Sequence, residues 1–144
     1  MRGASQPILS LDIVVPNQTR YLRLVGNIAE QIAKELVDFT GDRDALAYHL
    51  NLVLTEAVTN AIQYGFPRDD HDSVRVLLSY ENSDLCVRVF DHGQGFDLAN
   101  LGALEVDEFC ERGRGLFLIR ALMDTVEYRR TECGNVLEMK KRLL

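Results

Sequence analysis

Two polar side chains that could perform chemistry, Glu56 and Asn60, stand four residues apart in a run of mostly small and apolar residues. A spacing of four places both side chains on one face of a helix. An unpaired charge beside apolar neighbours is costly, so we expect the pair to meet a ligand. A hydrated Mg²⁺ would suit both, since it takes oxygen ligands and keeps several waters. The alternative is a solvated helix face on which the two side chains hydrogen-bond to each other.

A glycine-rich segment, residues 91–96, directly follows a predicted strand. Asp91 at the strand end could accept hydrogen bonds from an exocyclic amine. Gly93 and Gly95 let the backbone approach a flat ligand or take a positive φ. The segment therefore indicates either a site for a flat ligand that carries an amino group or an ordinary turn at the end of a strand.

A second glycine-rich segment, Gly113-Arg114-Gly115-Leu116, stands at the start of a predicted helix. The free N–H groups and the dipole of a helix favour anions at that end. Its glycines also remove the Cβ atoms that would keep phosphates away. The segment is not a Walker A loop, because no GK[ST] follows, and it lacks the strand and GxGxxG of a Rossmann fingerprint. The alternative is a flexible start of a helix.

The hydrophobic pattern predicts the helices and strands that must position these residues. Helices are predicted over residues 18–39, 43–64 and 113–123, and strands over residues 8–15, 73–80, 85–90, 125–130 and 136–141. A turn is predicted at residues 81–84 and an irregular segment at residues 97–112. Helices and strands are partly segregated along the chain and the hairpins are antiparallel. The predicted fold class is therefore α+β, a two-layer α/β sandwich.

Length and composition limit the classes of function. The 144 residues predict a single domain over residues 1–144, with its core at about 8–142. The net charge of -6 argues against direct nucleic-acid binding, because phosphate backbones require a basic field. No apolar run reaches the ~18 residues of a membrane helix, and the first residues carry no apolar signal segment. The three cysteines are scattered without a CxxC pair, which favours a reducing cytoplasm.

The order and spacing of the three polar and glycine-rich segments resemble the N, G1 and G2 boxes of the GHKL ATPases, the superfamily of DNA gyrase and the histidine kinases. The wordings EAVTNAI at 56–62, DHGQGF at 91–96 and GRGLFLIRALMD at 113–124 look most like the bacterial anti-sigma-factor serine kinases. The resemblance covers about residues 8–142. It implies the Bergerat fold, in which a mixed, mostly antiparallel sheet packs against three helices.

The resemblance also implies a role for each matched residue. Asn60 would ligate the Mg²⁺ that bridges the phosphates of ATP. Glu56 would be the general base that activates a serine hydroxyl, or a water-mediated anchor for the metal. Asp91 would bind the adenine amino group. The remaining nucleotide-binding residues implied by the family pattern are Gly93, Gly95, Gly113, Arg114, Gly115, Leu116 and Asn135.

The sequence departs from the family pattern at two positions. Members often carry His where this chain has Tyr64, and Gly-Thr where it has Gly134-Asn135. Asn135 can still donate and accept a hydrogen bond. We therefore expect these differences to affect nucleotide affinity more than catalysis.

The resemblance implies an ATP-using anti-sigma factor and protein serine kinase that phosphorylates a STAS-domain anti-sigma-factor antagonist and forms a homodimer. The alternative is a non-catalytic ATP-binding module that sequesters a partner such as the sigma factor. Retention of Glu56 favours catalysis, because a pure binder needs no base. A detached histidine-kinase catalytic domain is disfavoured, because the sequence shows no dimerisation helix around a phosphoacceptor histidine.

Overall fold

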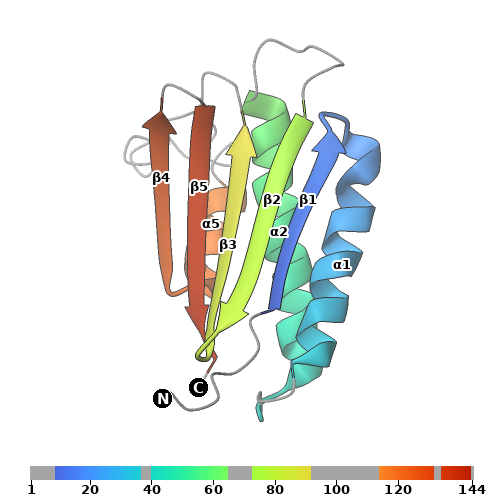
Figure 1. Ribbon diagram of the computed structural model, residues 1–144, viewed down its shortest axis with the longest axis vertical. Helices are drawn as coiled ribbons and strands as arrows, with labels where there is room; N and C mark the ends of the chain where they lie inside the picture. The colour runs from blue at the N-terminus through green and yellow to red at the C-terminus, as the bar shows by residue number, and fades with distance from the viewer. Residues whose placement is uncertain (1–8, 37–39, 65–72, 92–113, 132–133, 144) are drawn as a thin grey trace, which may run out of the picture.

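The computed structural model describes residues 9–36, 40–64, 73–91, 114–131 and 134–143. These residues form two layers, a five-stranded sheet and a layer of helices that covers one of its faces (Figure 1). The predicted α+β two-layer sandwich is therefore confirmed. Among the described helices, none has the length and apolar character needed to cross a membrane.

The sheet has the strand order β1-β2-β3-β5-β4. The strands are β1 Leu9–Pro16, β2 Ser73–Glu81, β3 Asp84–Asp91, β4 Thr125–Thr131 and β5 Gly134–Arg142. The sheet was expected to be mixed and mostly antiparallel, but each described pairing of neighbouring strands is antiparallel, so no parallel pairing occurs among the described strands. The turn predicted between β2 and β3 is confirmed, with φ of 53° at Asn82 and 68° at Ser83. Two successive positive φ angles are typical of a type I′ turn, whose twist matches that of the strands it joins.

Within the described residues, α-helices pack on the inner face of the sheet. They are α1 Leu22–Glu35, α2 Arg43–Tyr64 and α5 Arg114–Leu122, and a short 3-10 turn, η1 Thr19–Tyr21, precedes α1. The first helix is shorter than the predicted 18–39, because the backbone becomes extended at Leu36, where ψ is 107°. The Leu36 side chain is nevertheless buried. Its apolar character therefore satisfied the helical pattern although the residue lies outside the helix.

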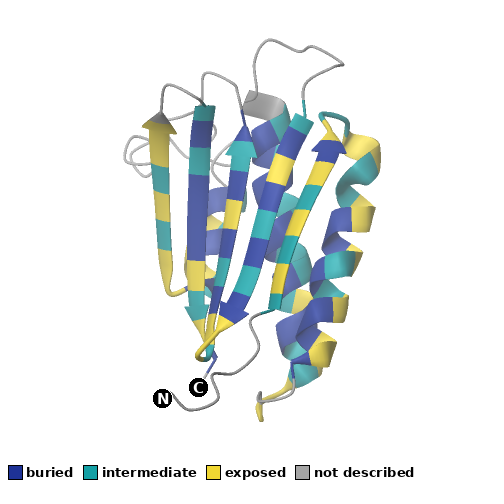
Figure 2. Ribbon diagram, viewed as in Figure 1, coloured by how far each residue is buried: buried dark blue, intermediate teal, exposed yellow. Residues whose placement is uncertain are grey.

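The hydrophobic core lies between the sheet and α2. Alternate side chains of each inner strand point toward the helices, and on β2 these are Val74, Val76 and Leu78, all at most 2% exposed. Figure 2 shows the same alternation of buried and exposed positions along the strands. α2 contacts α1, α5, β2 and β3, so it is the central element of the helical layer. A residue on its inner or lateral face is therefore held by packing from several sides.

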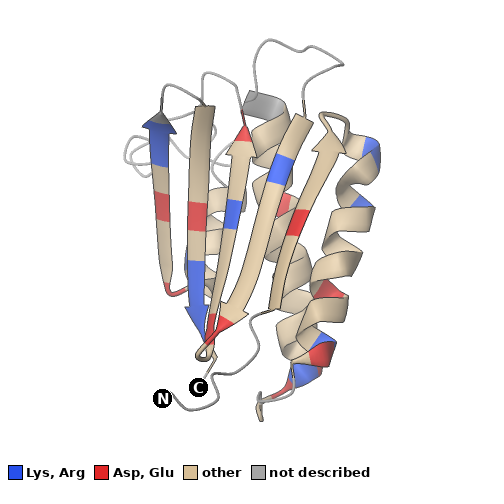
Figure 3. Ribbon diagram, in the orientation of Figure 1, with Lys and Arg blue, Asp and Glu red and all other residues tan. Residues whose placement is uncertain are grey.

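The outer face of the sheet carries acidic and basic residues on neighbouring strands (Figure 3). Arg75 on β2 donates two hydrogen bonds to the Asp12 carboxylate on β1, at 2.9 and 2.6 Å. These hydrogen bonds lower the pKa of Asp12 and raise that of Arg75. Cross-strand ion pairs of this kind join the strands on the face that the helices leave uncovered.

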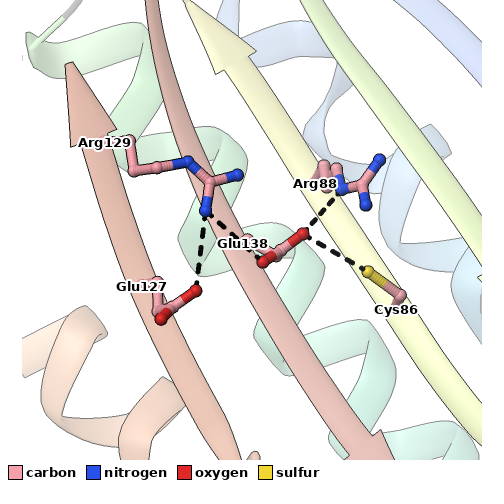
Figure 4. A network of polar contacts seen from close by, with 5 residues as sticks. All are labelled: Cys86, Arg88, Glu127, Arg129 and Glu138. Carbon is pink, nitrogen blue, oxygen red and sulfur yellow. Dashed lines mark hydrogen bonds and ion pairs between the residues drawn. The ribbon is translucent and has the colours of Figure 1, made fainter. Parts of the chain in front are cut away.

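A second polar network on the outer face surrounds Glu138 of β5 (Figure 4). The Glu138 side chain is only 8% exposed, and Arg88 Nε donates to its Oε2 at 2.7 Å. Arg129 lies 3.7 Å from the other carboxylate oxygen, and the Cys86 thiol lies 3.9 Å from Oε2. The hydrogen bond from Arg88 is the main cause that lowers the pKa of Glu138, while burial raises the pKa of the Cys86 thiol. The network therefore holds a nearly buried carboxylate in its charged form.

Candidate nucleotide and phosphoryl-transfer site

Glu56 and Asn60 occupy successive turns of α2, so the predicted sharing of one helix face is confirmed. The intervening and following positions Ala57 and Ala61 are 1% and 3% exposed. Their small side chains let α2 lie close to its neighbours. Glu56 is half-buried and Asn60 is 4% exposed. The carboxylate therefore retains access to solvent, whereas the amide is enclosed.

Glu56 meets the beginning of α5 at Gly115. A Cβ atom built on Gly115 would lie 2.5 Å from Glu56 Oε2 and 3.4 Å from its Cδ. The glycine thus provides the space that the carboxylate occupies. Gly115 lies in the first turn of α5, where backbone N–H groups have no partner within the helix and the dipole favours anions. The structure therefore brings a carboxylate to a helix end that suits a phosphate group.

The Asn60 side chain has an unsatisfied polar atom. Its Nδ2 is fully buried and has no hydrogen-bond partner among the described residues. A buried amide group without a partner costs about 1–3 kcal/mol. Asn60 offers an amide oxygen to a hard cation and an N–H donor to a phosphate oxygen. A metal–phosphate group at this position would fit the chemistry of the side chain and remove that cost.

Asp91 and Asn135 form a buried hydrogen-bonded pair. They are cross-strand partners, Asp91 at the end of β3 and Asn135 near the start of β5. Their exposed fractions are 6% and 4%, and Asn135 Nδ2 donates to Asp91 Oδ1 at 2.9 Å. A carboxylate held in this way can present an acceptor to an amino group of a ligand. Asn135 therefore provides a hydrogen-bond donor beside Asp91, although it differs from the residue typical of the family pattern.

The predicted site residues come together only in part within the described residues. Glu56 contacts Gly115, and Asp91 contacts Asn135. Leu116 belongs to the hydrophobic core, so its backbone is the part left for a ligand. Gly93, Gly95 and Gly113, the predicted irregular segment at 97–112 and the side chain of Arg114 lie outside what the structure describes.

The structure adds one relationship that the sequence did not suggest. Gly115 was assigned to phosphate binding, but in the structure it also borders the Glu56 carboxylate. No signal in the sequence could reveal this contact, because it depends on how α2 packs against α5. Among the described residues, no group of three or more His, Cys, Asp or Glu side chains could hold a metal ion.

The chain is similar in sequence to bacterial proteins that are named serine-protein kinases. The chain is similar to a protein named Serine-protein kinase RsbW from Listeria monocytogenes serotype 4a (strain HCC23), with 40% identity over 87 residues. That match covers 54% of this chain and 55% of the relative, so it spans about half the length of that protein. A protein of the same name from Bacillus subtilis (strain 168) is 28% identical over 141 residues, covering 92% of this chain and 85% of the relative.

A solved structure and a family model extend the similarity to the fold. The histidine kinase domain from Erythrobacter litoralis EL346 blue-light activated histidine kinase superposes with a TM-score of 0.57 and 19% identity. The superposition covers 90% of this chain and 62% of that chain, and it supports the fold alone. The model of the histidine kinase-like ATPase domain matches residues 15–141, which is most of the sequence. The chain therefore belongs to the family of histidine kinase-like ATPase domains.

Proposed function

We propose that this protein is an anti-sigma factor and ATP-dependent serine kinase that phosphorylates a STAS-domain anti-sigma-factor antagonist. The observation that carries the proposal is the contact of Glu56 with Gly115, because it joins a carboxylate base to a helix end suited to phosphates. Membership of an ATPase family supports the use of ATP. The relatives named Serine-protein kinase RsbW support transfer to a protein serine.

In the proposed reaction, Glu56 accepts the proton of the substrate serine as its oxygen attacks the γ-phosphorus of ATP. The bond between the serine oxygen and the γ-phosphorus forms. The bond from that phosphorus to the bridging oxygen breaks, and ADP leaves with the electron pair. Glu56 then releases its proton to solvent. N–H groups in the first turn of α5 would stabilise negative charge on the transferring group.

Asp91 would bind the adenine amino group, with Asn135 holding the carboxylate in position. The backbone of Gly115 and Leu116 would contribute to the phosphate site. Gly93, Gly95, Gly113 and Arg114 remain predicted contacts, since their roles rest on the family pattern. An adenine pocket at one end of β3 and a phosphate site at α5 would together hold the nucleotide between the sheet and the helices.

Asn60 would hold Mg²⁺ together with oxygens of the nucleotide and water. Its amide oxygen would be the ligand, while the unsatisfied Nδ2 donor of this buried side chain would meet a phosphate oxygen. When bound, the ion would neutralise charge on the phosphates. Glu56 could instead anchor the metal through a water, and the experiment below distinguishes that role from the role of a base.

The kinase proposal is tested by incubating the protein with labelled Mg-ATP and a STAS-domain protein from the same organism. We expect label on a serine of the STAS protein. Glu56→Gln should abolish transfer and keep ATP affinity within about threefold, since removing a base affects a step after binding. Transfer that persists in Glu56→Gln contradicts the role as base. A loss of Mg²⁺-dependent ATP affinity would instead assign Glu56 to metal binding.

The alternative function, a non-catalytic module that sequesters a partner, has its own outcome in this experiment. A wild-type protein that binds ATP and its partner but transfers no label would establish it. The proposed partner inhibited by binding is the sigma factor. We further propose that the protein is a single domain that acts in the cytoplasm. It would contact neither nucleic acid nor a membrane directly.

The proposed homodimer concerns the surface beside α1. A groove of about 340 Å³ between β1 and α1 is lined partly by Leu9, Leu11, Ile28 and Ile32. β1 lies at the edge of the sheet, so its outer backbone edge pairs with no described strand. A second copy that covers this surface would bury the apolar groove. Sedimentation of the wild type should give the mass of a dimer. Ile28→Glu should lower the measured mass to that of the monomer. A wild type with the mass of a monomer would refute the dimer.

A further inference from the structure

Position 115 is occupied by glycine at a point where a side chain would collide with Glu56. An ideal Cβ would lie 2.5 Å from Glu56 Oε2, and contacts of a real Cβ below 3.0 Å are essentially never seen. The distances to Cδ and Cβ of Glu56 would be 3.4 and 3.5 Å, which are ordinary contacts. The collision is therefore confined to the carboxylate at the tip of the glutamate.

The tip of Glu56 is also the part of this contact that can move most easily. The glutamate side chain has several rotatable bonds, and among the described residues no ion pair holds the carboxylate elsewhere. Alanine is a better helix former than glycine, so the helix itself would accept a methyl group at position 115. A methyl group should thus leave the fold intact and displace the carboxylate.

We propose that Gly115 is a positioning residue for Glu56. This inference rests on the proposed function of Glu56 as the base. The absence of a side chain in the first turn of α5 keeps the carboxylate beside the helix end where the phosphates would bind. A displacement of about 1 Å at a reacting group can cost about 100-fold in rate. The glycine therefore acts on the transfer step through Glu56, in addition to any backbone contact with the nucleotide.

This role makes a different prediction from phosphate binding. If the glycine were needed only for the close approach of phosphates, its replacement would lower ATP affinity. A glycine that positions the base would lower the rate of transfer from bound ATP and leave the affinity nearly unchanged. Moreover, its effect would depend on the length of the side chain at position 56. Aspartate at that position is one methylene shorter, so its carboxylate oxygens would not occupy the place of Oε2, which is the atom that the added methyl group would meet.

The experiment is a double-mutant cycle of Gly115→Ala and Glu56→Asp, with single-turnover transfer, ATP affinity and thermal unfolding measured for each protein. Gly115→Ala should lower transfer by about 100-fold in the wild-type background. In the Glu56→Asp background it should change transfer by less than about threefold. ATP affinity and the unfolding temperature should be retained. Arg120→Ala, an exposed change on the same helix, is the matched control and should keep full transfer.

Two results would overturn the proposal. One is an equal loss of transfer from Gly115→Ala in both backgrounds. The other is a loss of ATP affinity with unchanged transfer from the bound complex. A wild type without transfer would refute the proposed function instead. In that case the carboxyl ¹³C resonance of Glu56 still tests the positioning role directly. This resonance should shift in Gly115→Ala, and an unchanged resonance would refute the positioning role.

Discussion

The side-chain amide of Asn135 donates a hydrogen bond to the carboxylate of Asp91 at 2.9 Å, across the pairing of β3 and β5. Both side chains are buried, so the bond forms in a medium where it is stronger than in water. It ties the proposed adenine-binding carboxylate to a neighbouring strand. The Asn135 that departs from the family pattern therefore supplies a donor from within the sheet.

Asn135→Ala should weaken ATP binding, because the Asp91 carboxylate would lose this donor. Hydrogen bonds to charged groups contribute about 1.5–3 kcal/mol, so we expect a loss of about 10-fold to 100-fold in affinity. Asn135→Thr keeps a hydroxyl donor and should bind ATP within a few-fold of the wild type. Isothermal titration calorimetry measures both, and equal affinities for wild type and Asn135→Ala would remove this residue from the nucleotide site.

Asn60→Ala should weaken ATP binding most strongly when Mg²⁺ is present. Loss of a metal-site residue costs about tenfold or more in metal affinity. Titration with ATP in excess Mg²⁺ should reveal this loss, and the difference from wild type should shrink in EDTA. Thr59→Ala changes the adjacent residue, whose hydroxyl bonds to the Thr55 carbonyl, and should keep the Mg²⁺ dependence. A variant at Asn60 with wild-type affinity in Mg²⁺ would exclude it as the ligand.

Gly26→Ala should destabilise the fold, in contrast to the change at Gly115. A Cβ at Gly26 would lie 2.5 Å from Asn51 Oδ1 and 2.8 Å from Thr55 Oγ1. Those two atoms are hydrogen-bonded to each other, and Asn51 Nδ2 donates to Glu30, so neither side chain moves easily. Overpacking of this kind costs about 1–3 kcal/mol. Urea unfolding measures the loss of unfolding free energy, and Arg23→Ala on the same helix is the control. Unchanged stability of Gly26→Ala would show that α1 and α2 can separate without cost.

Arg88→Met should destabilise the protein at neutral pH by about 1–3 kcal/mol, because the nearly buried Glu138 carboxylate loses its main donor. The fold lowers the pKa of Glu138 below its ordinary value of 4.5. Its contribution is therefore present above pH 4.5 and is lost as the pH falls through the lowered pKa of the folded state. The difference in unfolding free energy between wild type and variant should shrink at acid pH.

Urea unfolding at pH 7 and at about pH 3 checks this expectation. Glu138→Gln is the matched variant, since it keeps the shape of the side chain and removes the titrating group. It should show a weaker loss of stability on acidification than the wild type. The difference in unfolding free energy between wild type and Arg88→Met could instead stay constant between these two pH values. That result would mean that Arg88 acts through packing rather than through the Glu138 carboxylate.

Much of the fold followed from local patterns in the sequence. The alternation on β2 and the helical spacing on α2 are properties of successive residues, and both were predicted with bounds close to those observed. The end of α1 was misplaced because the buried Leu36 continues the apolar spacing in an extended conformation. The apolar pattern records burial, and burial does not require that the helix continue.

Some features of the candidate site likewise followed from the sequence, and others required the tertiary structure. The sequence by itself determined that Glu56 and Asn60 share a helix face, because four residues make about one turn. It also placed glycines at the start of α5. Only the tertiary structure decided that Gly115 borders the Glu56 carboxylate and that Asn135 bonds to Asp91. Those contacts join segments far apart in the chain, so they depend on strand order and on the packing of α2 against α5, which no local periodicity specifies.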